Sequence, residues 1–238
     1  MDFMHIVAHR GAEDLHLENS MAAFQAAAPA DAFELDVHTT LDNQLIVLHD
    51  RTAARVAAAD SAHRDAPVAS LTLEQVKEIT LLDGSRVPTL EEVLAATELP
   101  IQVEIKAPSA VPALQTLLAR QPSELERLLF ICFIDVASVE LADRLPAARL
   151  GFLREHGFGD LSVLEQVPAR NAAAVLPYWK SLELEAISAL HARGIKVGCW
   201  TIRDEHSFDI AQQAGVDFVT VSDPTRFLNP GNPSPLQW

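Results

Sequence analysis

The sequence has few cysteines and no long apolar run. Its 238 residues include two cysteines, Cys132 and Cys199, and both lie in apolar, strand-like stretches. We therefore expect reduced core thiols and no disulfide. No stretch approaches the roughly 18 apolar residues that a membrane-spanning helix needs. The first residues, Met1–Val7, lack the basic region and apolar stretch of a signal peptide, which predicts a cytoplasmic protein without stable membrane association.

Positive charge is also scarce. The chain has 18 lysines and arginines against 33 acidic residues, for a formal net charge of −15. Because nucleic acids and anionic membrane surfaces are polyanions, this balance argues against both as partners. It leaves a small anionic substrate open, since a bound cation and a few basic side chains decide the local potential. No feature of the sequence specifies an oligomeric state.

Apolar runs typical of strands alternate with amphipathic, helix-like stretches along the whole chain. This alternation predicts βα units and a parallel sheet. The chain length and eight such runs favour an α/β fold of the (β/α)8 TIM-barrel type, formed by one domain over residues 1–238. The predicted strands are His5–Ala8, Ala32–Val37, Ile101–Ile105, Leu128–Phe133, Arg149–Leu153, Ala172–Leu176, Lys196–Trp200 and Phe218–Val221. The predicted helices lie within Ser20–Ala28, Thr89–Ala96, Val111–Arg120, Val136–Arg144 and Leu184–Arg193.

A ninth apolar run, Leu45–His49, follows the second strand too closely for a helical crossover between parallel strands. A hairpin is the physical alternative, with Asp42 and Asn43 as its turn residues. Symmetric pairing about that turn sets Asp36 opposite His49. The hairpin would thus return His49 to the barrel mouth.

Residues 51–86 have little strand pattern and are rich in alanine, aspartate and arginine. We expect a short insertion after strand two, at the barrel mouth, with one helix near Leu73–Ile79. The proline-rich tail after Asp223 is expected to be irregular.

Pairs of polar residues end two of the predicted strands. Glu34 and Asp36 stand two apart, so both carboxylates point to one face of their strand. Glu104 and Lys106 repeat this arrangement at the end of the next strand. Two buried like charges need a cation, and a hard divalent ion such as Mg²⁺ or Ca²⁺ suits all-oxygen ligands. An exposed carboxylate pair and an internal Glu–Lys ion pair are the structural alternatives.

Two histidines also follow strand-like runs. His9 and Arg10 end the first strand, where they could serve acid–base catalysis and grip phosphate oxygens. His49 follows Leu45–Leu48. A single such histidine is more often structural, but two that converge with three carboxylates and two basic groups have the parts of metal-assisted phosphoryl transfer.

These residues belong to an ordered set of motifs, which consists of His9-Arg10-Gly11, Glu18-Asn19-Ser20, Glu34-Leu-Asp36, Leu48-His49-Asp50, the segment Pro88–Leu94, Glu104-Ile-Lys106 and Trp200-Thr201. In order and approximate spacing, the set resembles the glycerophosphodiester phosphodiesterase family over nearly the whole chain. The resemblance implies a (β/α)8 barrel and a glycerophosphodiester substrate, hydrolysed to an alcohol and glycerol 3-phosphate. It also implies metal ligation by Glu34, Asp36 and Glu104, acid–base catalysis by His9 and His49, and phosphate binding by Arg10 and Lys106.

In the mechanism that the resemblance implies, the glycerol hydroxyl beside the ester attacks phosphorus and a cyclic phosphate forms. Three positions depart from the family pattern. Leu17 replaces a proline, Arg51-Thr-Ala-Ala follows His49-Asp50, and Val221-Ser222-Asp223-Pro224 carries its aspartate one position late. These departures concern the rim and substrate preference.

Two other functions are compatible with the same residues. A lysophospholipid or sphingolipid phosphodiesterase would need an apolar rim, which the short polar insertion does not favour. A barrel that only binds a phosphorylated ligand would be expected to lack a histidine or carboxylate. Trp200 and Phe133 end predicted strands and either contact the substrate alcohol or pack in the core.

Overall fold

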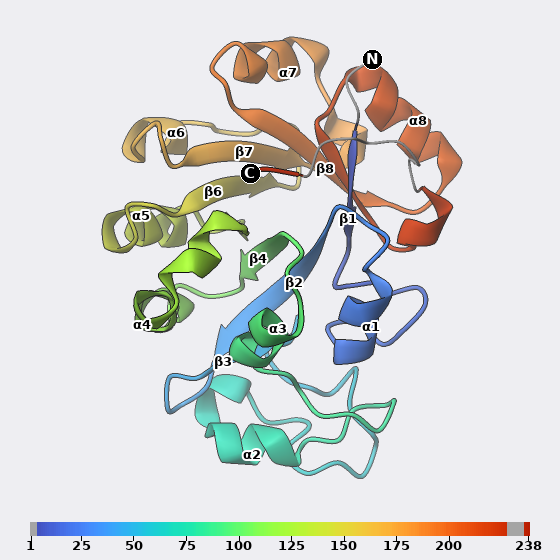
Figure 1. The fold of residues 1–238 in the computed structure, drawn as a ribbon, viewed down its shortest axis with the longest axis vertical. Coiled ribbons are helices and arrows are strands. Elements are labelled where there is room, and N and C mark those ends of the chain that lie inside the picture. The colour runs from blue at the N-terminus through green and yellow to red at the C-terminus, as the bar shows by residue number, and fades with distance from the viewer. Residues whose placement is uncertain (1–3, 228–235) are drawn as a thin grey trace.

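The computed structural model describes residues 4–227 and 236–238. Eight parallel strands form a closed barrel, because β1 pairs with both β9 and β2. A short strand, β3, pairs antiparallel with β2 outside the ring. Figure 1 shows the strands with helices around them. The (β/α)8 prediction is confirmed. The strands are β1 His5–Ala8, β2 Ala32–Thr39, β3 Leu45–Val47, β4 Ile101–Ile105, β5 Leu128–Cys132, β6 Arg149–Arg154, β7 Ala172–Pro177, β8 Lys196–Ile202 and β9 Phe218–Val221.

The predicted helices are present, with ends shifted by up to two residues. Two further helices, α6 and α8, were not expected. Asp204 caps the start of α8 by accepting from Ser207, and Gly215 ends it in the left-handed conformation, so both boundary signals were readable in the sequence. The helices are α1 Met21–Ala26, α2 Leu73–Glu78, α3 Leu90–Ala96, α4 Ala110–Arg120, α5 Asp135–Arg144, α6 Val163–Gln166, α7 Leu184–His191 and α8 Glu205–Ala214.

The barrel has two apolar layers separated by its strands. On β2, Phe33, Leu35 and Val37 belong to the outer cluster that packs against the helices. The inner cluster fills the lumen with side chains that include Ile131 and Phe218. This period-two division leaves the alternate β2 residues, among them Glu34 and Asp36, facing the lumen.

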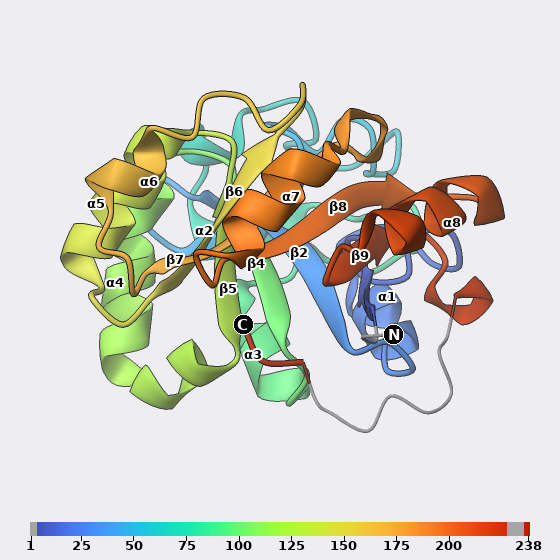
Figure 2. The ribbon, with the colours of Figure 1, turned by 90° about the horizontal axis from the view of Figure 1, so that it is seen from above.

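Large aromatic side chains fill one end of the barrel lumen. An added Cβ at Gly198 would lie 2.0 Å from the Phe218 ring, so only glycine leaves room for that ring. Trp238 makes an edge contact with Phe218, at 5.7 Å between ring centroids, and its indole N–H donates to the carbonyl of Arg127. Since Arg127 precedes β5, this packing lies at the amino ends of the strands. Figure 2 shows the C-terminal end beside the lower ends of the strands. The open part of the lumen is therefore at the carboxyl ends.

The predicted hairpin between β2 and β3 exists, but its register differs by one residue. Thr39 pairs with Leu45, and the Leu48 amide donates to the Asp36 carbonyl, so Leu48 rather than His49 lies opposite Asp36. The symmetric two-residue turn was wrong. Three residues form the loop, with Asn43 at φ 59°, and the Gln44 amide donates to the Thr40 hydroxyl. A left-handed residue in a three-residue loop is a favoured hairpin geometry.

Residues 51–86 form a compact unit beside the mouth, with α2 at the position predicted for its helix (Figure 1). Unlike the polar segment expected from composition, this unit has its own apolar cluster, which Ile46 and Leu48 join from the hairpin. The tail after Asp223 begins with a 3₁₀ turn, Pro224–Arg226, while residues 228–235 lie outside the described part of the chain. Both cysteines are buried and free, as predicted. Among residues 4–227 and 236–238, no helix has the length and apolar character to cross a membrane.

Candidate active site

A cavity of about 260 Å³ lies at the carboxyl ends of the strands. Every site residue predicted from the sequence lines it except Asp36, which is fully buried. The lining residues predicted in advance are His9, Arg10, Glu34, His49, Glu104, Lys106 and Trp200. The fold thus brings together side chains from four strands and one hairpin.

Three carboxylates form the centre of this site. Glu34, Asp36 and Glu104 each offer one oxygen, and these oxygens lie within 4.8 Å of one another. One oxygen of Glu34 is buried without a hydrogen-bond partner, and the corresponding oxygen of Asp36 has only the ammonium of Lys106, 3.4 Å away. Buried anionic oxygens with so little compensation are costly. Their all-oxygen chemistry fits a hard divalent cation such as Mg²⁺ or Ca²⁺.

The titration of these carboxylates reflects their crowding. Burial, followed by repulsion from Asp36, raises the pKa of Glu34 well above its ordinary value. The same two causes raise the pKa of Glu104 to about 7. Burial also acts to raise the pKa of Asp36, but the charges of Lys106 and Arg10 outweigh it and the pKa is lowered. A divalent cation would favour the charged form of all three.

Arg10 and Lys106 place positive charge beside the carboxylates. The Arg10 amide donates to Glu34 at 2.9 Å, and its guanidinium Nε lies 3.4 Å from an Asp36 oxygen. Lys106 Nζ donates to Glu104 at 2.7 Å and lies 3.4 Å from Asp36. Arg10 has φ 49°. Gly11 follows at φ 78°, where an added Cβ would lie 2.6 Å from the backbone of Ala23, so the tight turn requires glycine.

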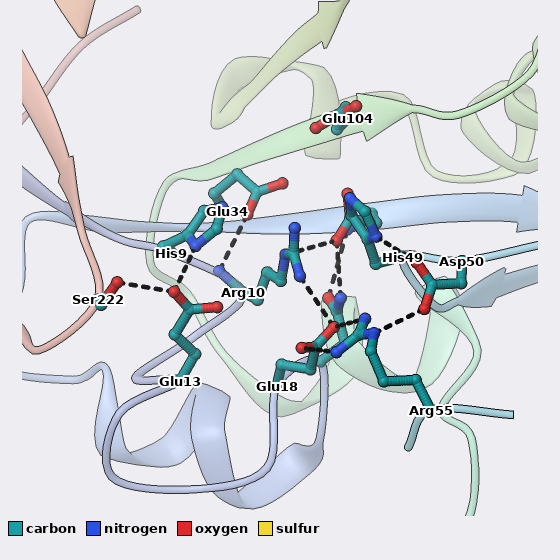
Figure 3. A network of polar contacts seen from close by, with 12 residues as sticks. His9, Arg10, Glu13, Glu18, Glu34, His49, Asp50, Arg55, Glu104 and Ser222 are labelled. Atoms are coloured by element: carbon teal, nitrogen blue, oxygen red, sulfur yellow. Dashed lines mark hydrogen bonds and ion pairs between the residues drawn. The ribbon is translucent and has the colours of Figure 1, made fainter. Parts of the chain in front are cut away.

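His9 is held by an acidic partner that the sequence analysis missed. Its Nδ1 lies 2.8 Å from Glu13, which also accepts a 2.7 Å hydrogen bond from the Ser222 hydroxyl (Figure 3). Burial acts to raise the pKa of Glu13, but the hydrogen bonds from His9 and Ser222 contribute to lowering it to about 2. Glu13 stands four residues after His9, a spacing that brings side chains together on a helix. No helix was predicted there, so the spacing alone did not indicate this contact.

His49 has a corresponding carboxylate in its chain neighbour. Its Nδ1 lies 2.7 Å from Asp50, and its carbonyl lies 3.2 Å from the His38 ring nitrogen. Burial, with the charges of Arg10 and Lys106, lowers the pKa of His49. The imidazole is therefore neutral near neutral pH and able to accept a proton.

Asn19 makes two hydrogen bonds to Asp36, one of the three carboxylates. It is buried, and its side-chain N–H donates to Asp36 at 2.8 Å while its side-chain oxygen accepts from the Asp36 amide at 3.3 Å. Its φ of 55° is one that asparagine tolerates. Asn19 therefore fixes the Asp36 side chain, a role not assigned to it from the sequence.

An aromatic wall borders the cavity on the β5 and β8 side. The Trp200 indole N–H donates to the Leu176 carbonyl, and its ring contacts Phe133 and Tyr178 at centroid distances of 5.4 and 5.5 Å. Phe133 follows the end of β5 and is 42% exposed. Ile134 and Val136, which follow Phe133 in the chain, are 36% and 65% exposed, and we call these three residues the apolar rim.

Comparison with known proteins shows which family the chain resembles. Residues 9–226 match the Glycerophosphoryl diester phosphodiesterase family. The chain is 26% identical over 240 residues to a glycerophosphodiester phosphodiesterase of Caldanaerobacter subterraneus, covering 94% of this chain and 96% of that protein. It is 28% identical over 274 residues to a lysophospholipase D of Rattus norvegicus, covering 94% and 85%.

A solved structure shares the fold. It is an Oleispira antarctica phosphodiesterase in complex with the product sn-glycerol-3-phosphate, with TM-score 0.81, 21% identity, and coverage of 93% of this chain and 94% of that one. The family match extends over most of the present chain. The protein therefore belongs to the glycerophosphoryl diester phosphodiesterase family, whose members hydrolyse glycerophosphodiesters.

Proposed function

We propose that this protein uses a divalent metal, Mg²⁺ or Ca²⁺, to hydrolyse small glycerophosphodiesters to an alcohol and glycerol 3-phosphate. The carboxylate cluster carries the proposal. Three clustered, largely buried carboxylates lie beside Arg10 and Lys106, and two of them line the same cavity as the two histidines. The bound product of the Oleispira antarctica phosphodiesterase supports the same product here.

Each residue has a role in this proposal. Glu34, Asp36 and Glu104 would hold the metal, which supplies positive charge for the phosphate and polarises its oxygens. Arg10 and Lys106 bind the phosphate oxygens and stabilise charge that develops on them. Trp200 lines the cavity as part of the aromatic wall and would contact the substrate.

His9 and His49 divide the two proton transfers. The glycerol hydroxyl beside the ester attacks phosphorus, and one histidine takes its proton. The other donates a proton to the alcohol oxygen as its bond to phosphorus breaks. Water then opens the cyclic phosphate with the transfers reversed, giving glycerol 3-phosphate.

The test is an assay of both products from one soluble substrate. Metal-loaded protein incubated with glycerophosphocholine should release choline and glycerol 3-phosphate in equal amounts. Release of phosphocholine would mean that the other ester bond is cleaved. Saturable binding without release of either product would show a non-catalytic barrel and contradict the proposal.

A lysophospholipase D activity is the second candidate, favoured by the exposed Phe133, which lines the cavity, and by the exposed Ile134 and Val136, which follow it in the chain. Such a rim could hold an acyl chain, and a lysophospholipase D is among the relatives. We still expect soluble diesters to have the higher kcat/KM, because the exposed apolar surface beyond the cavity consists of few side chains and the cavity itself is only about 260 Å³.

The measurement is kcat/KM for glycerophosphocholine and for lysophosphatidylcholine. Val136→Asp is the matched variant, since Val136 lies on the rim and does not line the cavity. It should lower activity on the lipid and leave the soluble substrate unaffected. A higher kcat/KM for the lipid with native protein would favour the second candidate.

Glu13→Gln should lower kcat about 10–100-fold, the range typical of residues that orient a functional side chain, here His9, without contacting the substrate. The carboxylate fixes the His9 ring through Nδ1, and glutamine has neither the charge nor two equivalent acceptor oxygens. KM should change little, because Glu13 does not line the cavity. Ser222→Ala should have a smaller effect, since it removes a contact to Glu13 but not to His9. Equal kcat values for the Gln variant and native protein would exclude this role.

A further inference from the structure

Arg55 reaches from the insertion into the network around the cavity. Its Nε donates to Asp50 at 2.7 Å, and its two terminal nitrogens donate to the two oxygens of Glu18 at 2.5 and 2.7 Å. One guanidinium therefore binds two carboxylates from different segments. It does not line the cavity itself.

The carboxylates of Asp50 and Glu18 also contact residues of the site. The second oxygen of Asp50 holds the His49 ring at Nδ1, and Glu18 accepts from the Arg10 guanidinium at 3.0 Å. A continuous path thus runs from His49 through Arg55 to Arg10, as Figure 3 shows. Arg10 follows β1 and His49 follows β3, and the backbones of both segments bond to β2 through Gly11 and Leu48. The path through Arg55 adds a direct connection between the two side chains.

We propose that Arg55 is a positioning residue that fixes the proton-transferring His49 and the phosphate-binding Arg10 relative to each other. This inference rests on the proposed function. It means that the insertion, residues 51–86, helps to position the residues of the site in addition to any effect on substrate preference.

The geometry favours positioning over a purely stabilising ion pair. Arg55 has a side chain that is 48% exposed, and single ion pairs at such exposure contribute little to stability. The guanidinium of Arg55 is planar, so its nitrogens donate to the carboxylates of Asp50 and Glu18 at the same time and in fixed directions. A lysine has one ammonium on a flexible stem and cannot hold both carboxylates in this way. Arg55 also contributes to lowering the pKa of Asp50, which keeps that partner of His49 charged.

The experiment compares Arg55→Met, Arg55→Lys and Arg86→Met with native metal-loaded protein. Arg86 is the matched control, because it is an exposed arginine of the same insertion that donates to Glu78 and Thr80. Arg55→Met should lower kcat/KM about 10–100-fold, as expected for residues that orient others. Arg55→Lys should restore only a small part of this loss, and Arg86→Met should keep native activity.

Two further measurements separate positioning from folding. Thermal unfolding should show similar midpoints for the Arg55 and Arg86 variants, with activity assayed well below them. Arg55→Met should also weaken binding of glycerol 3-phosphate, measured by calorimetry without turnover, because Arg10 loses its support. Combined with Asp50→Asn, it should lower kcat less than the product of the separate losses, since both act through His49.

The outcomes are distinct. Native kcat/KM in Arg55→Met, full activity in Arg55→Lys, or an equal loss in Arg86→Met would overturn the proposal. Failure of native protein to hydrolyse any glycerophosphodiester would instead refute the proposed function. In that case unchanged glycerol 3-phosphate binding in Arg55→Met would still contradict the link to Arg10.

Discussion

Chelation of divalent metal should abolish turnover, and addition of Mg²⁺ or Ca²⁺ should restore it. The reason is the clustering of Glu34, Asp36 and Glu104, whose oxygens lie within 4.8 Å of one another in a buried site. Without a cation the phosphate would meet three carboxylates whose charge Arg10 and Lys106 offset only in part. Residual activity in a sample verified as metal-free would contradict this expectation.

The effect of metal on stability should depend on pH in a defined direction. In metal-free protein, burial and repulsion raise the pKa of Glu104 from 4.5 to about 7. The folded state then binds more protons than the unfolded chain between these values, so its stability falls as pH rises through that window. Added metal must compete with these protons. The increase in unfolding temperature on adding metal should therefore be larger at about pH 8 than at about pH 5.

Variants of the ligands provide the specific control. Glu34→Gln, Asp36→Asn and Glu104→Gln should each weaken metal binding, measured by calorimetry, while the barrel stays folded. Glu92→Gln is a suitable comparison, because Glu92 caps α3 away from the cavity and should leave metal affinity unchanged. Native metal affinity in all three ligand variants would place the metal elsewhere.

His9→Ala and His49→Ala should each lower kcat by roughly 10²–10⁴, the range that general acid–base catalysis supplies. This corresponds to roughly 3–5 kcal/mol of transition-state stabilisation. Both imidazoles line one cavity, and each has a carboxylate at Nδ1. That arrangement leaves Nε2 of each ring to exchange a proton with the substrate.

The double variant tests whether the histidines act in one reaction step. Its loss should be smaller than the product of the two separate losses, because proton removal and proton donation serve the same transition state. His191→Ala is the control, since His191 contacts Asp217 and does not line the cavity. Fully multiplicative losses, or near-native rates in either single variant, would contradict the division of roles.

Period-two alternation explains why much of the site could be predicted from the sequence. Glu34 and Asp36 had to share a face once their strand was identified, and Phe33 and Leu35 had to face the helices. Parallel strands then placed Glu104 beside Asp36, which are register partners. These conclusions needed only strand geometry and the closure of a barrel.

The contacts made by loops could not be predicted in this way. The hairpin register was wrong by one residue because a left-handed Asn43 allowed a three-residue loop, and the sequence does not distinguish this from a two-residue turn. Glu13 and Arg55 were missed for a related reason. Their partners depend on side-chain directions within irregular backbone, and no periodicity specifies these.

The apolar cluster of residues 51–86 is a core separate from that of the barrel. The barrel strands carry the carboxylates, whereas the hairpin that precedes His49 packs Ile46 and Leu48 into the core of residues 51–86. Substitutions in that small core can alter the shape of the rim without disturbing the strands that hold the carboxylates. The fold can in this way alter the rim and the position of His49 through one segment, while the carboxylates that would hold the metal stay in place.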